Sequence, residues 1–135
     1  MPELPEVETT RRGIAPVVCG QRITRLRTGT RRLRYPVDPA ALNLLTGSTL
    51  NDISRRGKYL IFDCDNQGVL VHLGMSGSLR LVTNDVPDRP HDHWEICFEN
   101  GVCLRYHDPR RFGALLYWRG DPLEHSLLAG LGVEP

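Results

Sequence analysis

The chain has 135 residues, of which 40% are hydrophobic and 24% charged, a length and composition typical of one soluble globular domain. No apolar run approaches the length of a membrane span and the N-terminal residues lack a signal-peptide core, which predicts a cytoplasmic protein without membrane contact. The net charge of +1 excludes a strongly basic or acidic chain, so bulk charge alone does not indicate a partner.

The N-terminal segment MPELPEVET has the composition of a helix start. Pro5 suits the first helical turn, where a missing N–H costs little, and the glutamates favour the positive end of the helix dipole. Gly13 can end a helix in a left-handed conformation. We therefore expect a short amphipathic helix over residues 5–12.

Pro2 is not explained by a helix start. Initiator methionine is generally removed before a small residue such as proline, so the mature chain would begin with a secondary amine beside Glu3. An α-amino group has an ordinary pKa of about 7.7 to 8.0, and burial near a helix N-terminus lowers it. Part of the amine is then unprotonated at neutral pH, as nucleophilic attack on an electrophilic carbon requires.

Arginines are concentrated in the first third of the chain. Residues 9–37 contain eight arginines and no acidic residue. They are Arg11, Arg12, Arg22, Arg25, Arg27, Arg31, Arg32 and Arg34. Arginine favours bidentate phosphate contacts, but a solvated face gives the same composition, so both interpretations stay open.

Turn and strand patterns dominate the rest of the chain. Residues 17–35 alternate loosely, which predicts strands interrupted near residues 28–29. Asp38 and Pro39 then supply an N-cap and a first-turn residue for a short helix that ends at Gly47.

From residue 49 onward the apolar pattern is mostly that of strands. KYLIFDC and GVLVHLGMSGSLRLV flank a DNQG turn, and WEICFE and VCLRYHD flank Asn100-Gly101, a hairpin signal. GALLYW is expected to extend the sheet of that hairpin, and TNDVPDRPHDH is a loop by composition. A last helix is predicted after Asp121, with Leu127, Leu128 and Leu131 on its apolar face. The expected fold is mainly β, a two-sheet antiparallel β-sandwich flanked by short α-helices.

The four cysteines lie at positions 19, 64, 97 and 103. None forms a C-x-x-C pair or another spacing typical of a zinc site, so no metal is expected in this chain. In a reducing compartment we expect all four to be free, buried thiols.

Two glycine-rich stretches carry candidate functional residues. RRGKYL places Lys58 at a strand start, where a solvated lysine is the ordinary interpretation. HLGMSGSL places Met75 on a glycine-flanked turn, where it is either core filler or a wedge between stacked bases.

HDPRRFG and PHDHW are the other candidate stretches. In the first, Arg110 and Arg111 could hold phosphates and Phe112 could stack on bases, although a surface turn with a core phenylalanine gives the same pattern. In the second, His91 and His93 would share one face of a strand, and phosphate contact is a better functional hypothesis than metal binding.

Five motifs in this order, MPELPEVET, RRGKYL, HLGMSGSLR, HDHW and YHDPRRFGA, resemble the N-terminal domain of bacterial formamidopyrimidine-DNA glycosylase. The resemblance spans essentially the whole chain. It implies a base-excision-repair enzyme that removes oxidised purines, such as 8-oxoguanine and formamidopyrimidines, and then cleaves the strand by β,δ-elimination.

The resemblance also implies catalytic roles. Pro2 would attack the anomeric carbon of the flipped nucleotide to form a Schiff base, and Glu3 would act in acid-base steps around the sugar. Glu6 matches a supporting carboxylate, and Lys58 matches a lysine that contacts phosphate and assists elimination.

DNA-contacting positions follow from the same resemblance. His91 and Arg110 match DNA contacts, and Arg111 is expected to join them. Met75, Arg110 and Phe112 match the three residues that fill the gap left by the extruded base, a step that offsets part of the cost of flipping. The implied partner is damaged double-stranded DNA.

The resemblance assigns residues 1–135 to a single N-terminal catalytic domain. The helix-two-turn-helix and C-terminal zinc finger of the family lie outside this chain, so no cofactor is expected here and structural zinc only there. We expect a monomer that acts on DNA in the cytoplasm, at the nucleoid. Two alternatives remain, a non-catalytic module that binds damaged DNA and a plain interaction domain.

Overall fold

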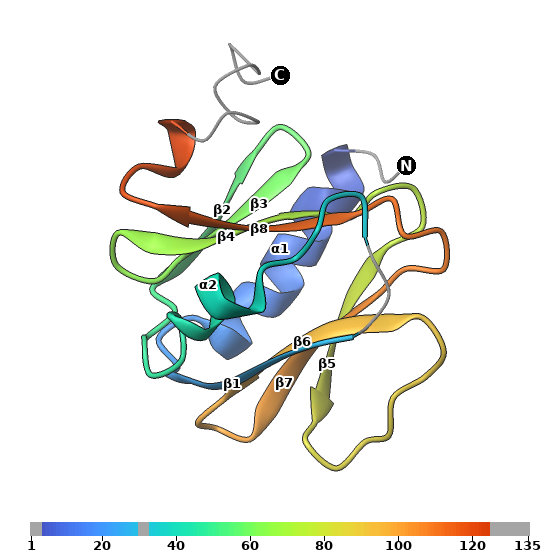
Figure 1. Ribbon diagram of the computed structural model, residues 1–135, viewed down its shortest axis with the longest axis horizontal. Coiled ribbons are helices and arrows are strands. Elements are labelled where there is room, and N and C mark those ends of the chain that lie inside the picture. Colours follow the sequence, from blue (N-terminus) through green and yellow to red (C-terminus); the bar gives the residue numbers. More distant parts are fainter. Residues whose placement is uncertain (1–3, 30–32, 125–135) are drawn as a thin grey trace.

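The computed structural model describes residues 4–29 and 33–124, and its core is two four-stranded antiparallel sheets packed face to face (Figure 1). One sheet has the order β1-β6-β7-β5 and the other β2-β3-β4-β8. The strands are β1 (Ile23–Thr28), β2 (Asp52–Arg56), β3 (Tyr59–Asp63), β4 (Gln67–His72), β5 (Ser78–Thr83), β6 (Asp92–Phe98), β7 (Val102–His107) and β8 (Ala114–Arg119). The predicted mainly β sandwich with flanking helices is confirmed.

Helix α1 (Leu4–Val18) is longer than the expected helix over residues 5–12. Val7, Ile14 and Val18 are buried, and this apolar stripe continues the helix past Gly13. The helix ends at Val18, two residues before Gly20, which has a left-handed φ of 85°. The prediction that Gly13 ends the helix was therefore wrong, because burial of the stripe outweighs the weak helix propensity of one glycine.

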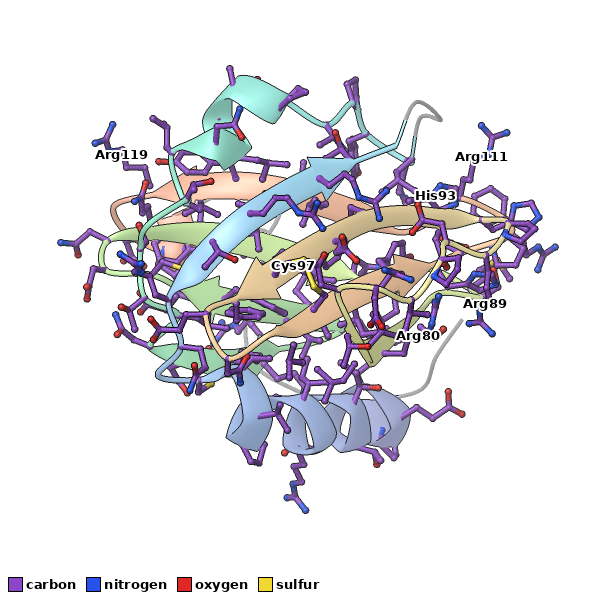
Figure 2. All side chains as sticks on the ribbon, turned by 90° about the horizontal axis from the view of Figure 1, so that it is seen from below. Arg80, Arg89, His93, Cys97, Arg111 and Arg119 are labelled. Atoms are coloured by element: carbon purple, nitrogen blue, oxygen red, sulfur yellow. A yellow bond between two sulfur atoms is a disulfide. The ribbon has the colours of Figure 1, made fainter. Side chains whose placement is uncertain are left out.

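The two helices cover opposite open sides of the sandwich. Helix α1 contacts β2, β3 and β5, whereas α2 (Pro39–Asn43) contacts β1, and Figure 2 shows the two helices on opposite sides of the sheets. The Asp38 side chain caps α2 by accepting hydrogen bonds from the N–H groups of Ala40 and Ala41, as predicted.

Apolar side chains from both sheets and both helices form one continuous core. Among its fully buried members are Leu60, Phe62, Val71, Trp94, Ile96, Leu104, Tyr106 and Leu115. A second, smaller cluster lies on the other face of the β2-β3-β4-β8 sheet and contains Ile61, Leu70 and Trp118. Because β4 contributes to both clusters, its sequence is apolar at consecutive positions.

One expectation about strand partners was wrong. GALLYW forms β8, which pairs with β4 and not with the β6-β7 hairpin. GVLVHLGMSGSLRLV forms two strands that lie in different sheets, because β4 pairs with β3 and β8 whereas β5 pairs with β7. The reason is a pair of tight loops, residues 73–77 between β4 and β5 and residues 108–113 between β7 and β8. In each of them the chain crosses from one sheet to the other, a non-local arrangement that alternation alone does not encode.

The β6-β7 hairpin confirms the Asn100-Gly101 turn signal and corrects the cysteine prediction. The Gly101 N–H donates to the Phe98 carbonyl oxygen and Gly101 has a φ of 85°, so the loop contains one residue more than a two-residue turn. This register places Cys97 opposite Cys103, and the two form a disulfide. Cys19 and Cys64 are free.

After β8 the chain turns at Gly120 into a short 3₁₀ helix, η1 (Pro122–Glu124). The Asp121 side chain accepts a hydrogen bond from the Leu123 N–H, which agrees with the predicted cap. The rest of the predicted C-terminal helix lies outside the described residues. In the part of the chain that is described, no helix is long and apolar enough to cross a membrane.

Candidate nucleic-acid interface

The loops 73–77 and 108–113, which carry the predicted DNA-contacting residues, lie against each other. Their backbones approach each other closely: a Cβ on Gly74 would lie 2.5 Å from the Gly113 nitrogen, and one on Gly113 would lie 2.6 Å from the His72 carbonyl oxygen. Only glycine permits this approach, and the φ of Gly74 is 68° as well. The glycines of the two motifs therefore bring Met75 and Phe112 to one surface.

Tyr106 of β7 and Asp108, the first residue of the second loop, are fully buried beneath the exposed tips of the two loops. The Tyr106 hydroxyl is 3.0 Å from the Leu73 carbonyl oxygen and 2.8 Å from Asp108 Oδ2. Gly113 N–H also donates to Asp108 Oδ2, at 2.9 Å, and the Ser76 hydroxyl donates to Oδ1, at 2.8 Å. Burial raises the pKa of Asp108, but these hydrogen bonds outweigh burial and hold it below its ordinary value.

The side chains at the tips of the loops are exposed. Met75 is 47% exposed and Phe112 45% exposed, although both are apolar. The interpretations of Met75 and Phe112 as core residues are therefore wrong. Exposed apolar residues on rigid loops are typical of a binding surface.

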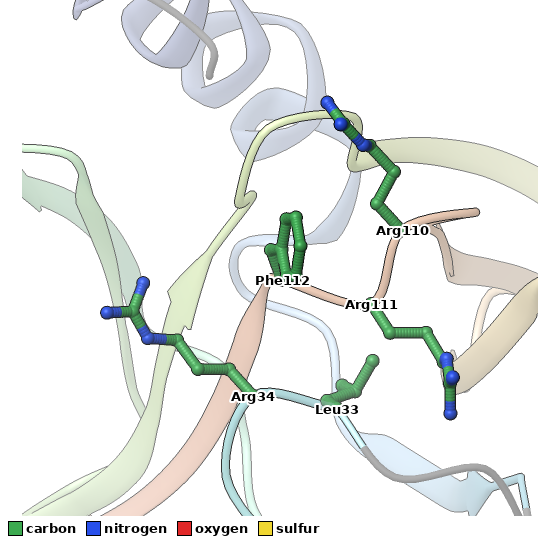
Figure 3. A pocket seen from close by; sticks show the side chains of 5 residues that line it. All are labelled: Leu33, Arg34, Arg110, Arg111 and Phe112. Carbon is green, nitrogen blue, oxygen red and sulfur yellow. The ribbon is translucent and has the colours of Figure 1, made fainter.

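Arg110 and Arg111 leave the second loop in different directions. The Arg110 guanidinium carbon is 5.6 Å from the centre of the Phe112 ring, so the cation covers the ring. Arg111 points away from both, and its φ of 57° is unusual for a residue with a side chain (Figure 3). With Leu33 and Arg34 these residues line an open cavity of about 430 Å³. Three guanidinium groups and an exposed ring suit a phosphate and a base.

His72, at the end of strand β4, contacts the Met75 loop and lies near two of the cationic residues, Arg34 and Lys58. Its Nδ1 accepts a hydrogen bond from the Gly74 N–H. Burial lowers the pKa of His72, and the positive charges of Arg34 and Lys58 lower it further. A neutral imidazole is thus available to accept this hydrogen bond. Lys58 lies close enough to the loop pair for its charge to affect the pKa of His72.

Lys58 follows Gly57 in the tight turn between β2 and β3. The φ of Gly57 is 59°, and its carbonyl oxygen accepts a hydrogen bond from the Arg55 guanidinium. This places Lys58 at the end of the hairpin that lies beside the N-terminal end of α1 (Figure 1).

The N-terminal end of α1 is fixed to the same hairpin. Glu8 forms ion pairs with Arg11 and Arg12 of its own helix and lies 3.5 Å from the Arg55 guanidinium of β2. Hydrogen bonds from Arg11 and Arg12 lower the pKa of Glu8 to about 2. Glu6 is exposed on the first turn of this helix. Pro2 and Glu3, which precede it, lie outside the described residues, so their roles stay predictions.

The two histidines of PHDHW do not form a pair of ligands. His93 is buried and its Nε2 is 2.6 Å from the Asp108 carbonyl oxygen, so it is a structural residue. His91 precedes a β-bulge, has a φ of 70°, and lies with its ring centre 6.1 Å from that of His107. Figure 2 shows His93, Arg89 and Arg111 at one end of the sandwich, with Arg119 at the other.

Most of the arginine-rich segment that the structure describes is paired with acids. Arg11 and Arg12 pair with Glu8, Arg22 with Glu99, and Arg25 and Arg27 with the buried Glu95. Arg12, Arg22 and Arg25 are at least half exposed, which agrees with the interpretation of a solvated face. Arg25 and Arg27 also neutralise the buried carboxylate of Glu95. Arg34 instead lines the cavity beside the loop pair. Arg31 and Arg32 lie outside the described residues.

A set of possible metal ligands within the described residues consists of Glu95, Cys97 and Cys103. The two sulfurs are joined to each other, and Glu95 accepts hydrogen bonds from the Arg105 guanidinium at 2.6 and 2.9 Å. A carboxylate and two sulfurs already engaged in this way do not suit a cation.

The comparisons with known proteins agree with this geometry. Residues 1–115 match the family model described as formamidopyrimidine-DNA glycosylase N-terminal domain. The whole chain is 56% identical to the formamidopyrimidine-DNA glycosylases of Methylococcus capsulatus and Thioalkalivibrio sulfidiphilus and covers 50% of each. The chain belongs to the formamidopyrimidine-DNA glycosylase family, and it spans about half the length of these relatives.

Solved structures show the same fold. The Lactococcus lactis Fpg in complex with DNA containing N7-benzyl-Fapy-dG matches with a TM-score of 0.80 and 41% identity, over 87% of this chain and 44% of that one. A complex of Lactococcus lactis Fpg with DNA containing an abasic site matches with a TM-score of 0.80 and 40% identity.

Proposed function

We propose that this chain is the catalytic N-terminal half of a DNA glycosylase and AP lyase that excises oxidised purines from double-stranded DNA. The observation that carries the proposal is the loop pair. It presents Met75, Arg110 and Phe112 together above the buried Tyr106-Asp108 pair, at the side of the sandwich where the Lys58 turn and the start of α1 also lie. The matching Lactococcus lactis Fpg structures are complexes with N7-benzyl-Fapy-dG and abasic-site DNA, which supports the same partner for this chain.

The proposed mechanism begins with base extrusion. Phe112 and Met75 occupy the space in the stack, and the guanidinium of Arg110 offers hydrogen bonds to the base left without a partner. Opening the stack costs a few kcal/mol, which apolar contacts of exposed side chains offset in part. Arg34, Arg111 and His91 contact the phosphates beside the lesion.

Chemistry then follows at the sugar. The secondary amine of Pro2 attacks the anomeric carbon, the C–N bond to the damaged base breaks, and the base leaves with the amine proton. The bond between the anomeric carbon and the ring oxygen then breaks as that oxygen receives a proton from Glu3, which leaves an iminium. The iminium that results acidifies the adjacent sugar carbon, so the 3′ and then the 5′ phosphate leave in successive eliminations. Lys58 stabilises the negative phosphate during these steps, and Glu6 supports the terminal amine electrostatically. No metal takes part in the roles assigned to these residues.

The proposed enzyme acts in the cytoplasm at the nucleoid, as a monomer. The second candidate function, a module that binds damaged DNA without cutting it, is favoured by the same exposed loop pair, since a wedge alone suffices for recognition. The N-terminal amine separates the two candidates.

The experiment uses the protein that contains this chain and duplex DNA with a single 8-oxoguanine, and it measures strand cleavage in a single turnover. Wild-type protein is expected to cleave the damaged strand, and Phe112→Ala to cleave it about tenfold or more slowly, as the loss of one stacked aromatic contact implies. Leu123→Ala, which removes an equally exposed apolar side chain beyond the other end of β8, serves as the matched control. Tight binding with no cleavage by protein of verified N-terminus at Pro2 would favour the binding module.

A further inference from the structure

The carboxylate of Asp108 is buried in a place where a charge is costly. Asp108 is 0% exposed, yet it lies directly under the most exposed loops of this surface. Its side chain is held by neutral donors, namely the Ser76 and Tyr106 hydroxyl groups and the Gly113 N–H. A buried charge of this kind needs several such donors to offset desolvation.

The donors come from different segments, so the carboxylate joins parts of the chain that are distant in sequence. Ser76 belongs to the Met75 loop, and Gly113 ends the loop of Arg110 and Phe112. Oδ1 accepts a hydrogen bond from Ser76 of the first loop, and Oδ2 accepts one from Gly113 of the second loop. Tyr106, from strand β7, supports Oδ2 from below and also binds the Leu73 carbonyl oxygen.

Ser76 extends this connection to the backbone of the wedge. Its Oγ donates to Asp108 Oδ1 at 2.8 Å and accepts from the Arg110 N–H at 3.4 Å. The hydroxyl therefore contacts the second loop at two residues, Asp108 and Arg110. Phe112 follows Arg110 by two residues. The hydrogen bonds of Ser76 are well suited to set the spacing between the two wedge side chains.

We propose that Asp108 and Ser76 are positioning residues that lock the Met75 loop to the Arg110-Phe112 loop, so that the three side chains enter the DNA stack as one preorganised unit. This inference rests on the proposed function, because it assigns these side chains the task of filling the gap. Neither residue touches the reacting atoms. Their effect is on the conformation in which the wedge meets DNA, and so on base extrusion and not on the chemistry at the sugar.

The test uses Ser76→Ala, because removal of the buried carboxylate itself also lowers the stability of the domain. Ser78→Ala is the matched control, since Ser78 is exposed at the start of β5, two residues away. Two single-turnover rates are measured with the protein that contains this chain. One is cleavage at 8-oxoguanine in duplex DNA, and the other is cleavage at an abasic site in single-stranded DNA, where no stack has to be opened.

Ser76→Ala should lower the duplex rate about tenfold, as the loss of a hydrogen bond to a charged group implies, and leave the single-strand rate unchanged. Ser78→Ala should change neither rate. Equal losses on both substrates, or no loss on the duplex, would overturn the positioning role. If wild-type protein cleaves neither substrate, it is the proposed function that fails.

A double-mutant cycle with Phe112→Ala provides the readout that a general loss of stability would not give. If Ser76 acts by placing the wedge, Ser76→Ala should cost little further rate once Phe112 has been removed, because the two changes damage the same step. Independent, multiplicative losses in the double variant would contradict the proposal.

Discussion

Gly74 and Gly113 are in backbone contact although they belong to different loops, and a Cβ added to Gly74 would lie 2.5 Å from the Gly113 nitrogen. This contact brings the two exposed apolar side chains of the surface, Met75 and Phe112, onto a common base. It extends the pairing of β4 with β8, in which His72 lies opposite Ala114, into the two loops. The geometry of the proposed DNA wedge therefore depends on glycine at these positions.

Gly74→Ala should disturb the wedge more than the same change at a turn without neighbours. Gly101→Ala is the matched control, since Gly101 also has a positive φ but has open space around the added Cβ. Both variants should lose about 1 to 2 kcal/mol of unfolding free energy from the left-handed backbone, as measured by denaturant titration. Only Gly74→Ala should lose more than this and weaken binding to duplex DNA with an abasic site. Equal stability and equal binding of the two variants would contradict the prediction.

Glu95→Gln should destabilise the fold strongly. Glu95 and Arg105 are both almost fully buried, and Arg25 and Arg27 also contact the same carboxylate. Removing the charge leaves buried guanidinium groups without their anion, for which about 3 kcal/mol or more is expected.

The control for that change is Glu99→Gln, which removes an exposed carboxylate 3.8 Å from the Arg22 guanidinium on the same sheet. Its loss should stay below about 1 kcal/mol. Denaturant titration of both variants measures the difference, and a similar small loss in both would show that the buried network contributes little.

Glu8→Gln should flatten the acid limb of the stability profile. The pKa of Glu8 is lowered from 4.5 to about 2 by hydrogen bonds from Arg11 and Arg12, so its stabilising contribution is present above pH 4.5 and is lost as the pH falls towards 2. Thermal unfolding measured between pH 6 and the acid end should show a smaller decline in the variant than in wild type. Arg12→Gln, which removes one of the two donors, should lie between them; identical slopes in all three proteins would exclude the role of Glu8.

Alkylation of unfolded protein should distinguish the four cysteines. Without reductant, only Cys19 and Cys64 should react, because Cys97 and Cys103 are joined across the hairpin. After reduction all four should react. Peptide mass analysis gives the answer, and labelling of Cys97 before reduction would mean that the pair is open in solution.

The sequence predicted the elements of the fold better than their partners. Alternation and the turn residues identified the strands, the Asp38 cap and the Asn100-Gly101 hairpin, because these signals are local. It did not reveal that the chain changes sheets at Gly74 and at Gly113. The apolar stripe of α1 continues to Val18, and its burial extends the helix past Gly13 because it outweighs the weak helix propensity of one glycine.

The candidate site shows the same division. The exposed tips Met75, Arg110 and Phe112 were identified from motif resemblance, whereas Asp108 and Tyr106 beneath them were not. Nothing in the local pattern marks Asp108 as buried, since an Asp-Pro pair is a common surface turn. Only the tertiary structure shows that Asp108 accepts hydrogen bonds from both loops. Likewise, the pairing of the N-terminal arginines with Glu95 and Glu99 joins positions far apart in the chain.

The most direct test of the proposed chemistry is the intact mass of the protein after borohydride reduction in the presence of abasic-site DNA, with the N-terminus verified to begin at Pro2. We expect a covalent adduct of protein and DNA, with the DNA fragment located on the N-terminal peptide, because the proline amine forms the iminium that borohydride traps. Absence of an adduct, from protein that begins at Pro2 and binds this DNA, would contradict the proposed chemistry.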